Sequence, residues 1–267
     1  MTLPSLATFW FGEKLGCLEL ASLHSFLAVG HSVTVYSYEP IANLPDEVES
    51  RDAAELLPTD KIVITAHKGS PALHANLVRY AMMSRTDHLW VDLDLIALRP
   101  FDFEAEHVFG FENPDGSVNN AVLRLPRSSP ALARLLELTP HTRGIPPDVQ
   151  GLRRVKYWLR TMGRGRPIEE WRWGSAGPRA LTTFLRQTGE IRHALPIEAF
   201  YPVWIHDHAR LLEPGSGPRD FGPGTYAVHL WASDMRRTLA ERHGGRIPAG
   251  SFVAWAIERA RKDGLAA

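Results

Sequence analysis

The stretch HLWVDLDLIALRPF, at residues 88–101, is the part of the sequence around which the rest is organised. Asp92 and Asp94 stand one residue apart in this otherwise apolar run. A β-strand carries its side chains with a period of two, so we expect both carboxylates to leave the same face of one strand. Two like charges at that spacing, flanked by leucine and valine, would repel each other and lose their hydration in a core.

A bound divalent cation removes that cost, because hard oxygen ligands suit Mg²⁺ or Mn²⁺. Such ions are typically held by one or two carboxylates and completed by substrate phosphates and water. The alternative is a strand end whose aspartates only cap a turn, a place where aspartate is common. The apolar surroundings favour a metal and phosphate site, with Asp92 and Asp94 as its catalytic, metal-binding residues.

The composition is that of an ordinary globular protein. With 267 residues the chain is near the upper end for one hydrophobic core, so we expect a single domain over residues 1–267. A hydrophobic fraction of 44% argues against wholesale disorder. The 30 Lys and Arg residues balance the 30 Asp and Glu residues, so no overall charge points to nucleic acid as a partner.

The sequence also predicts where the protein resides. No run approaches the roughly 20 apolar residues needed to cross a bilayer, and no basic segment followed by a long apolar one suggests a signal peptide. The single cysteine, Cys17, cannot form an internal disulfide and is predicted to be a buried thiol in a helix. These features predict a soluble, cytoplasmic protein without a transmembrane segment.

The opening of the chain predicts a parallel α/β sheet. Residues 6–11 and 32–38 are apolar, aromatic and β-branched runs typical of strands, and residues 15–29 between them have helical spacing. A helix is predicted at residues 70–84, with Ser70 as N-cap and Pro71 at the first helical position, and it leads into the aspartate strand. The turn sequence Asn-Pro-Asp-Gly at residues 113–116 predicts a hairpin between strands at 108–112 and 119–125.

The remaining elements are predicted more simply. Residues 61–65 and 226–231 are expected to be strands, whereas residues 130–138, 149–161, 180–187 and 251–262 are expected to be helices. Residues 40–58 are expected to form a loop with one helical turn at 52–57, and GRGRP at 163–167 a flexible basic loop.

Five landmarks together resemble one known family. They are VDLDLIALRPF (residues 91–101), LVRYAM before it (77–82), NNAVLRLP after it (119–126), WGSAGPRALT (173–182) and AVHLW (227–231). The opening FWFGEKLGCLELASLHSFLAVGHSVTVYSY (9–38) fits the same pattern. In this order they resemble the DXD-type glycosyltransferases, in particular the family that contains alpha-1,4-galactosyltransferases, alpha-1,6-mannosyltransferases and bacterial capsule-type sugar transferases. The likeness runs from about residue 7 to about residue 237.

This resemblance implies a fold and a reaction. The fold would be GT-A, a Rossmann-like nucleotide-sugar-binding fold with a mixed, largely parallel sheet and a small hairpin. The reaction would be metal-dependent transfer of a hexose from a UDP- or GDP-sugar to a glycan or lipid-linked acceptor, with retention of anomeric configuration, as in polysaccharide biosynthesis. Mn²⁺ or Mg²⁺ would be the cofactor, acting on the leaving diphosphate as a Lewis acid.

The resemblance also assigns roles at the metal. Asp94 would ligate the ion directly, while Asp92 would contact the donor ribose or reach the ion through water. His229 would supply a nitrogen ligand or touch the diphosphate, although an isolated histidine in a strand is more often a core or surface residue. Arg79 would hold a phosphate or Asp92 with its guanidinium fork, unless it is an exposed helix arginine.

Other positions would bind the two sugars. The donor-binding set is Phe9, Trp10, Arg79, Asp92, Asn119, Asn120 and Trp231, and the acceptor side has Trp173, Gly177 and Pro178. Aromatic faces suit sugar rings, and glycines permit close backbone approach. For the aromatic residues core packing is the alternative, and for Asn119 and Asn120 a place in the hairpin turn.

Some features depart from the family pattern and bear on acceptor and donor choice. Thr86-Asp87-His88 stands where the family has Gly-Gly, Asn76 where aspartate is common, and Ala232-Ser233 where asparagine is frequent. A catalytically inactive sugar- or nucleotide-binding homologue is therefore one alternative. An aspartate-based phosphohydrolase is another, although that class expects its motif on the first strand, followed by Thr or Val.

Two further clusters are interpreted as surface. The basic residues Arg153, Arg154, Lys156, Arg160, Arg164 and Arg166 could meet an anionic acceptor or a membrane, but a solvated helix face is the favoured interpretation. His206-Asp207-His208 is expected to be a surface loop, because adjacent residues seldom share one metal geometry.

Overall fold

The computed structural model describes residues 3–66 and 69–262. Its strands are β1 (Leu6–Phe9), β2 (Val33–Ser37), β3 (Glu49–Asp52), β4 (Leu89–Val91), β5 (Leu95–Ala97), β6 (Val108–Phe111), β7 (Val118–Arg124), β8 (Arg143–Gly144), β9 (Arg166–Pro167) and β10 (Ala227–His229). Its α-helices are α1 (Cys17–Ala28), α2 (Ala72–Arg85), α3 (Pro130–Leu135), α4 (Gly151–Arg160), α5 (Pro178–Thr188), α6 (Ala232–His243) and α7 (Phe252–Lys262). Short 3₁₀ helices span Ala53–Glu55, Ile168–Glu170, Glu190–His193, Ile197–Ala199, Ile205–Leu212 and Pro218–Asp220.

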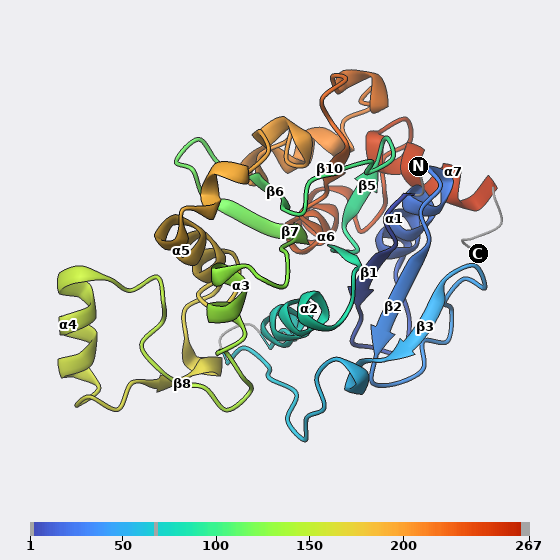
Figure 1. Ribbon diagram of the computed structural model, residues 1–267. Coiled ribbons are helices and arrows are strands. Elements are labelled where there is room, and N and C mark those ends of the chain that lie inside the picture. Colours follow the sequence, from blue (N-terminus) through green and yellow to red (C-terminus); the bar gives the residue numbers. More distant parts are fainter. Residues whose placement is uncertain (1–2, 67–68, 263–267) are drawn as a thin grey trace.

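A six-stranded sheet with the order β3-β2-β1-β4-β7-β6 forms the centre of the protein (Figure 1). The first four strands in this order run parallel, and β7 is antiparallel to both β4 and β6. Two small antiparallel pairs, β5 with β10 and β8 with β9, lie outside this sheet. The fold is therefore a mixed α/β fold with a mostly parallel, Rossmann-like sheet.

The central strands are buried on both faces, as parallel strands between helices must be. Because side chains alternate, Leu6 of β1 enters one core with Leu23 and Phe26 of α1. Its neighbour Ala7 enters a second core on the other face, with Val78 of α2. β4 likewise contributes Leu89 and Val91 to the first core and Trp90 to the second, so the sheet divides the interior into two layers.

The predicted hairpin is confirmed. Strands β6 and β7 pair in antiparallel register, with a β-bulge between Val108 and Gly110. The turn closes through a hydrogen bond from the backbone N–H of Gly116 to the carbonyl of Asn113, at 3.0 Å. Gly116 has φ of +76°, a conformation that glycine adopts without strain.

Two predictions about strands are wrong. Residues 61–65 were expected to be a strand but have no regular structure; Val63 instead packs under α2 in a separate apolar cluster. The edge strand is β3, within the stretch predicted to be a loop, and all four of its side chains are exposed. A strand at the edge of a sheet need not bury side chains on either face, so β3 has no hydrophobic pattern to detect.

Helix termini differ from the predictions as well. Ser70 is not the N-cap of α2, which starts at Ala72 after Pro71, although the Ser70 hydroxyl still accepts the Ala72 N–H at 3.2 Å. Helix α6 was not predicted, because only Ala232, Met235 and Leu239 enter the apolar cluster from its mostly polar sequence. The strand predicted at 226–231 is shorter in the structure, since β10 ends at His229 and Trp231 is the N-cap of α6.

Three predictions about surface and flexibility also need correction. Cys17 is exposed rather than buried, since it opens α1 at a solvent-facing turn. His208 is buried, with ring nitrogens 2.6 Å from the Ile205 carbonyl and 2.7 Å from the Thr238 hydroxyl. The basic loop at 163–167 is partly ordered as β9.

Among the described residues, no helix combines the length and apolar character needed to cross a membrane.

His74 of α2 gives the fold a pH dependence. Its ring is fully buried, Nδ1 lies 3.3 Å from the Val63 N–H and Nε2 lies 2.9 Å from the Tyr38 hydroxyl. Burial lowers the pKa of His74 to about 4 from the ordinary 6.5. Between pH 6.5 and about 4, the His74 side chain is therefore protonated in the unfolded chain but stays neutral in the folded chain. Stability from this group is complete above pH 6.5 and is lost as the pH falls towards 4, by about 3 kcal/mol.

Urea unfolding at about pH 7 and about pH 4.5 measures this loss. We expect His74→Gln to be destabilised at the higher pH but to lose less stability on acidification than the wild type. His141→Gln, at an exposed position, is the matched control and should behave like the wild type. An equal acid-induced loss in the His74 variant would show that other groups cause it.

Candidate metal centre and cleft

The two aspartates lie in a turn rather than on one strand face. Strand β4 ends at Val91 and β5 begins at Leu95, so Asp92 and Asp94 occupy the connection between them. The expectation of one continuous strand is therefore wrong, because the chain leaves the main sheet here to pair with β10. The Asp92 N–H is still tied to the main sheet, 2.8 Å from the carbonyl of Ala121 in β7.

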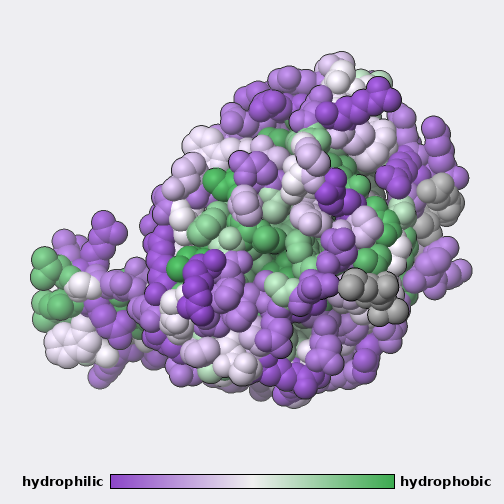
Figure 2. Space-filling model, turned by 45° about the horizontal axis from the view of Figure 1, so that its top comes forward, coloured by the Kyte–Doolittle hydropathy of each residue, from purple (hydrophilic) through white to green (hydrophobic). Residues whose placement is uncertain are grey.

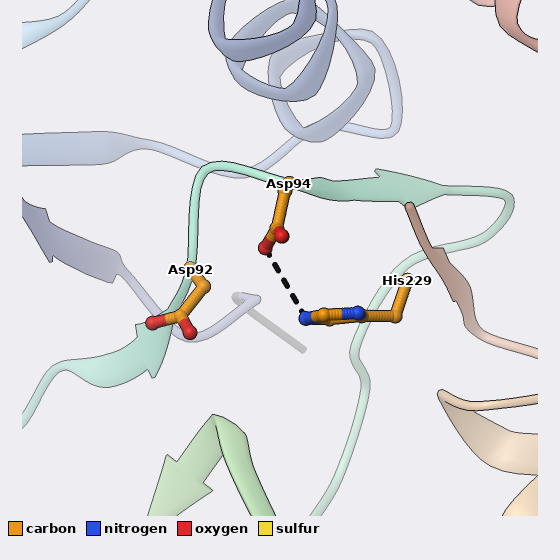
Figure 3. A group of neighbouring side chains, drawn as sticks. All are labelled: Asp92, Asp94 and His229. Carbon is orange, nitrogen blue, oxygen red and sulfur yellow. Dashed lines mark ion pairs between the residues drawn. The ribbon is translucent and has the colours of Figure 1, made fainter. Parts of the chain in front are cut away.

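The pairing of β5 with β10 brings His229 to the aspartates. In this antiparallel register His229 is the partner of Leu95, the residue that follows Asp94. The Leu230 N–H also donates to the Asp94 carbonyl at 2.7 Å. Backbone pairing thus places the imidazole beside the carboxylate, with Nε2 at 3.2 Å from Asp94 Oδ1 (Figure 3).

Asp92, Asp94 and His229 form a cluster that could hold a metal ion. One ligand atom from each lies within 4.8 Å of the others. Two ligands of one octahedral magnesium-like ion are separated by about 3–4 Å, so small side-chain adjustments would suffice. Carboxylates suit hard cations such as Mg²⁺ or Mn²⁺, whereas imidazole also suits softer ions such as Zn²⁺, so the donor set does not identify the metal.

Asp94 and His229 stabilise each other's charge. Burial alone would raise the pKa of Asp94, but the charge and hydrogen bond of His229 and the Ala232 N–H lower it below its ordinary value. Burial alone would lower the pKa of His229, but the charge and hydrogen bond of Asp94 and the nearby Asp92 raise it. Two carboxylates thus lie close to one imidazole, and their negative charges favour the binding of a cation at this place.

Arg79 is a buried residue, so the alternative of an exposed helix arginine is wrong. Its Nη2 lies 2.5 Å from Asp92 Oδ1, which also accepts the indole N–H of Trp90 at 2.7 Å. The guanidinium carbon is 4.5 Å from the centre of the Trp90 ring. A buried cation needs a partner of opposite charge, and here Asp92 is that partner. Arg79 therefore fixes one oxygen of Asp92.

Asn76 extends this network behind Arg79. Its Oδ1 accepts from Arg79 Nη1 and, at 2.8 Å, from the amide of Asn120. A Cβ atom at Gly177 would lie 2.7 Å from Asn76 Nδ2, so only glycine lets the chain pass so close. Gly177, predicted on the acceptor side, thus packs behind Arg79. Asn119 and Asn120 lie in β7, not in the hairpin turn.

A cleft of about 1660 Å³ contains the cluster. This exceeds the range of about 300–1,000 Å³ that is usual for sites of one small molecule, so a long ligand or two ligands would fit. Every residue predicted for the site except Gly177 lines it, namely Phe9, Trp10, Arg79, Asp92, Asp94, Asn119, Asn120, Trp173, Pro178, His229 and Trp231. Phe9 is nevertheless mainly a core residue, with its ring 5.8 Å from those of Tyr38 and His74.

Trp231 has an unusual backbone that positions its neighbours. Its φ of +56° is rare for a large side chain, and it reverses the chain between β10 and α6. The indole N–H donates to the Val203 carbonyl at 2.9 Å, which anchors the ring. As a result the first N–H of α6, on Ala232, points at Asp94 Oδ2 at 3.0 Å. The positive end of the α6 dipole therefore lies beside the cluster.

Three residues of the site had no recognised signal in the sequence. Trp90 falls within the apolar run before Asp92, and Asn76 differs from the aspartate that is common at this place in the family pattern. Glu112 is an isolated acid after β6, yet it lines the cleft. Burial raises its pKa, against the opposing effects of His229 and the Asn119 amide. Only the folded chain identifies these residues, since none of them belongs to a local motif.

Comparison with known proteins assigns no family. No family model matches the sequence, and the curated proteins contain no significant match. The structure itself shows a mixed α/β fold with an Asp-Asp-His cluster that could hold a metal ion.

Proposed function

We propose that this protein is a metal-dependent glycosyltransferase that moves a sugar from a nucleotide-diphosphate donor to a glycan or lipid-linked acceptor. The observation that carries the proposal is the Asp92–Asp94–His229 cluster inside a cleft large enough for two ligands. Asp94 and His229 would hold Mn²⁺ or Mg²⁺, which would offset the charge of the departing diphosphate. The likeness of the DXD stretch and its flanking motifs to GT-A glycosyltransferases supports the same proposal.

The position of the cluster in the fold supports a nucleotide ligand. Ligands of open α/β sheets gather outside the carboxyl ends of the parallel strands. Phe9 and Trp10 stand at this end of β1, and Asp92 follows the same end of β4. The buried indole N–H of Trp10 has no hydrogen-bond partner among the described residues, so a polar ligand could satisfy it.

Further residues would bind and orient the substrates. Arg79 would hold Asp92 in place through their ion pair, and the N-terminus of α6 would attract the diphosphate. Trp173 is 44% exposed at the cleft and would offer its ring to a sugar. Glu112, with its raised pKa, is the cleft carboxyl best suited to give or take a proton during transfer.

The phosphohydrolase alternative is not favoured. That class places its aspartate motif after the first strand of the sheet, followed by Thr or Val. Here the motif follows β4, and Leu95 and Ile96 come next. A nucleotide-sugar-binding homologue without activity would share the same cleft, and only its lack of turnover would distinguish it.

Thermal unfolding with a panel of UDP- and GDP-sugars, with and without Mn²⁺, tests the proposal. A ligand at 100 times its Kd stabilises the folded state by about 2.7 kcal/mol, so we expect one donor to raise the Tm by about 5 °C or more only when Mn²⁺ is present. The same donor should then be hydrolysed slowly without an acceptor. Stabilisation without hydrolysis or transfer would indicate a binding protein, and the lack of any Mn²⁺-dependent shift would contradict the metal site.

A further inference from the structure

Helix α4 stands apart from the body of the protein. Figure 1 shows it at the outer end of an arm whose base is the β8–β9 pair. None of its residues is buried, and only Tyr157 is half-covered. Leu152 is 88% exposed and Met162, just beyond the helix, is 81% exposed. Leucine and methionine normally lie in the core of a protein, so such large exposed fractions are unusual for them.

The exposed apolar residues share one face. Leu152, Val155 and Leu159 follow each other at spacings of three and four, which aligns them along α4, and Trp158 adjoins them. Met162 lies just beyond the end of the helix. Figure 2 shows this apolar group at the tip of the projecting arm. The basic residues of α4 are exposed, as the interpretation of a solvated helix face predicts, and the apolar face of α4 also has no covering element among the described residues.

The base of the arm is ordered, so its exposed tip is not the product of an unstructured loop. Arg143 Nη1 donates to the Gly165 carbonyl at 3.2 Å, and the indole N–H of buried Trp171 donates to the Arg166 carbonyl at 3.0 Å. A Cβ atom at Gly165 would lie 2.4 Å from the backbone of Gly144, so glycine is required where the two segments cross. The fold holds α4 outward by specific contacts.

The arm is also strongly basic. Residues 149–167 contain six Lys and Arg residues and no Asp or Glu. Arg166 pairs with Glu170, while the other five make no ion pair within the described part of the chain. At about 100° per residue, Arg154 and Lys156 flank the apolar face on its two sides. Basic residues beside an exposed apolar face are complementary to a surface that has anionic groups on the outside and apolar groups beneath them.

We propose that α4 docks this protein onto an anionic phospholipid membrane, with its apolar face inserted at the boundary of headgroups and acyl chains. The basic residues would contact lipid phosphates, and Trp158 would lie at the headgroup level that suits its amphipathic ring. A second copy of the chain is a poorer partner, because pairing two such arms would bring two sets of six cations together.

Docking would bring the cleft to the membrane. Asp148 and Gln150, shortly before α4, line the cleft. Asp148 Oδ2 lies 3.8 Å from Nη1 of Arg179, which also lines it. The membrane would therefore face the entrance near the arm. A lipid-borne acceptor could reach the cleft from this side; that consequence alone rests on the proposed function.

Vesicle co-sedimentation with the full chain tests the docking without any nucleotide or metal. We expect binding to phosphatidylcholine vesicles containing about 30% phosphatidylglycerol, little binding to phosphatidylcholine alone, and weaker binding as salt rises from about 0.1 to about 0.5 M. Arg154→Glu/Lys156→Glu should weaken binding by about 25-fold or more, at about fivefold per cation. The control Arg261→Glu/Lys262→Glu, at the exposed end of α7, should change binding far less.

The apolar face needs its own variant. Leu152→Ser/Leu159→Ser should weaken binding by on the order of 100-fold, because two large apolar side chains no longer enter the lipid. Leu136→Ser, at a partly exposed position outside the arm, is the control. Both arm residues are exposed, so we expect the Tm to stay unchanged. Equal vesicle binding by the arm variants and the wild type, or no binding at all, would overturn the proposal.

A fluorescent probe separates insertion from adsorption. In a Cys17→Ser background, Met162→Cys carries a polarity-sensitive dye, and Glu258→Cys on α7 carries it as control. Dye at 162 should brighten and shift to the blue with anionic vesicles, while dye at 258 should not. Binding without that response would refute insertion. A dimer that depends on Leu159 and forms without vesicle binding would identify a second copy as the partner and also overturn the proposal.

Discussion

Asp94→Asn should abolish Mn²⁺-dependent nucleotide binding while the chain still folds. The substitution keeps the size of the side chain and an oxygen that can accept the Ala232 N–H. It removes the negative charge that faces His229 Nε2 at 3.2 Å. Because the cation loses a charged ligand, we expect its affinity to fall by about 100-fold or more, as measured by calorimetry with Mn²⁺ and UDP or GDP.

The matched control is Asp234→Asn. Asp234 lines the same cleft but pairs with Arg237 on α6 and is not part of the cluster. Its neutralisation should leave Mn²⁺-dependent binding within a few-fold of the wild type. Unchanged metal dependence in Asp94→Asn, or equal losses in both variants, would show that the cluster does not hold the ion.

Arg79→Lys should reduce donor-sugar hydrolysis by about 100-fold although the charge is kept. The guanidinium binds Asp92 and Asn76 through different nitrogens and lies over the Trp90 ring. An ammonium cannot make both contacts in the same plane, so either Asp92 or Asn76 loses its partner. One lost charge-assisted hydrogen bond in a buried site accounts for an effect of about 2–3 kcal/mol.

Arg237→Lys is the control for this experiment. Arg237 lines the cleft as well, but its side chain is 62% exposed and its ion pair with Asp234 is a surface contact. We expect hydrolysis close to the wild-type rate. Hydrolysis at the wild-type rate in Arg79→Lys would show that any cation suffices beside Asp92. Melting curves of both variants would separate loss of activity from loss of fold.

Local sequence patterns predicted the elements that bury a regular face. The first strand–helix–strand unit could be predicted because β1 and β2 consist mostly of apolar, aromatic and β-branched residues and α1 repeats its apolar residues at helical spacing. The hairpin followed from the turn residues between Asn113 and Gly116. Strand β3 and helix α6 could not be predicted, because an exposed edge strand and a mostly polar helix lack such a pattern.

The amino-acid order was enough to select Asp92 and Asp94 as candidate metal ligands, because neighbours in the chain stay neighbours in any fold. It also marked Arg79 and His229 through a family resemblance, without placing them in space. Their positions depend on the folded chain, since the register of β5 with β10 brings His229 to Asp94 and the packing of α2 buries Arg79 beside Asp92.

The arm shows the same division. The basic and apolar residues of 149–167 are visible in the sequence, and their spacing predicts an amphipathic helix. Which face would be covered could not be predicted, because burial depends on what packs against a helix and not on the helix itself. The β8–β9 pair holds α4 away from both cores, so its apolar residues remain in solvent. Whether a face of α4 is buried is thus decided by contacts between residues that are distant in sequence. This exposure is what distinguishes α4 from a helix that packs in a core.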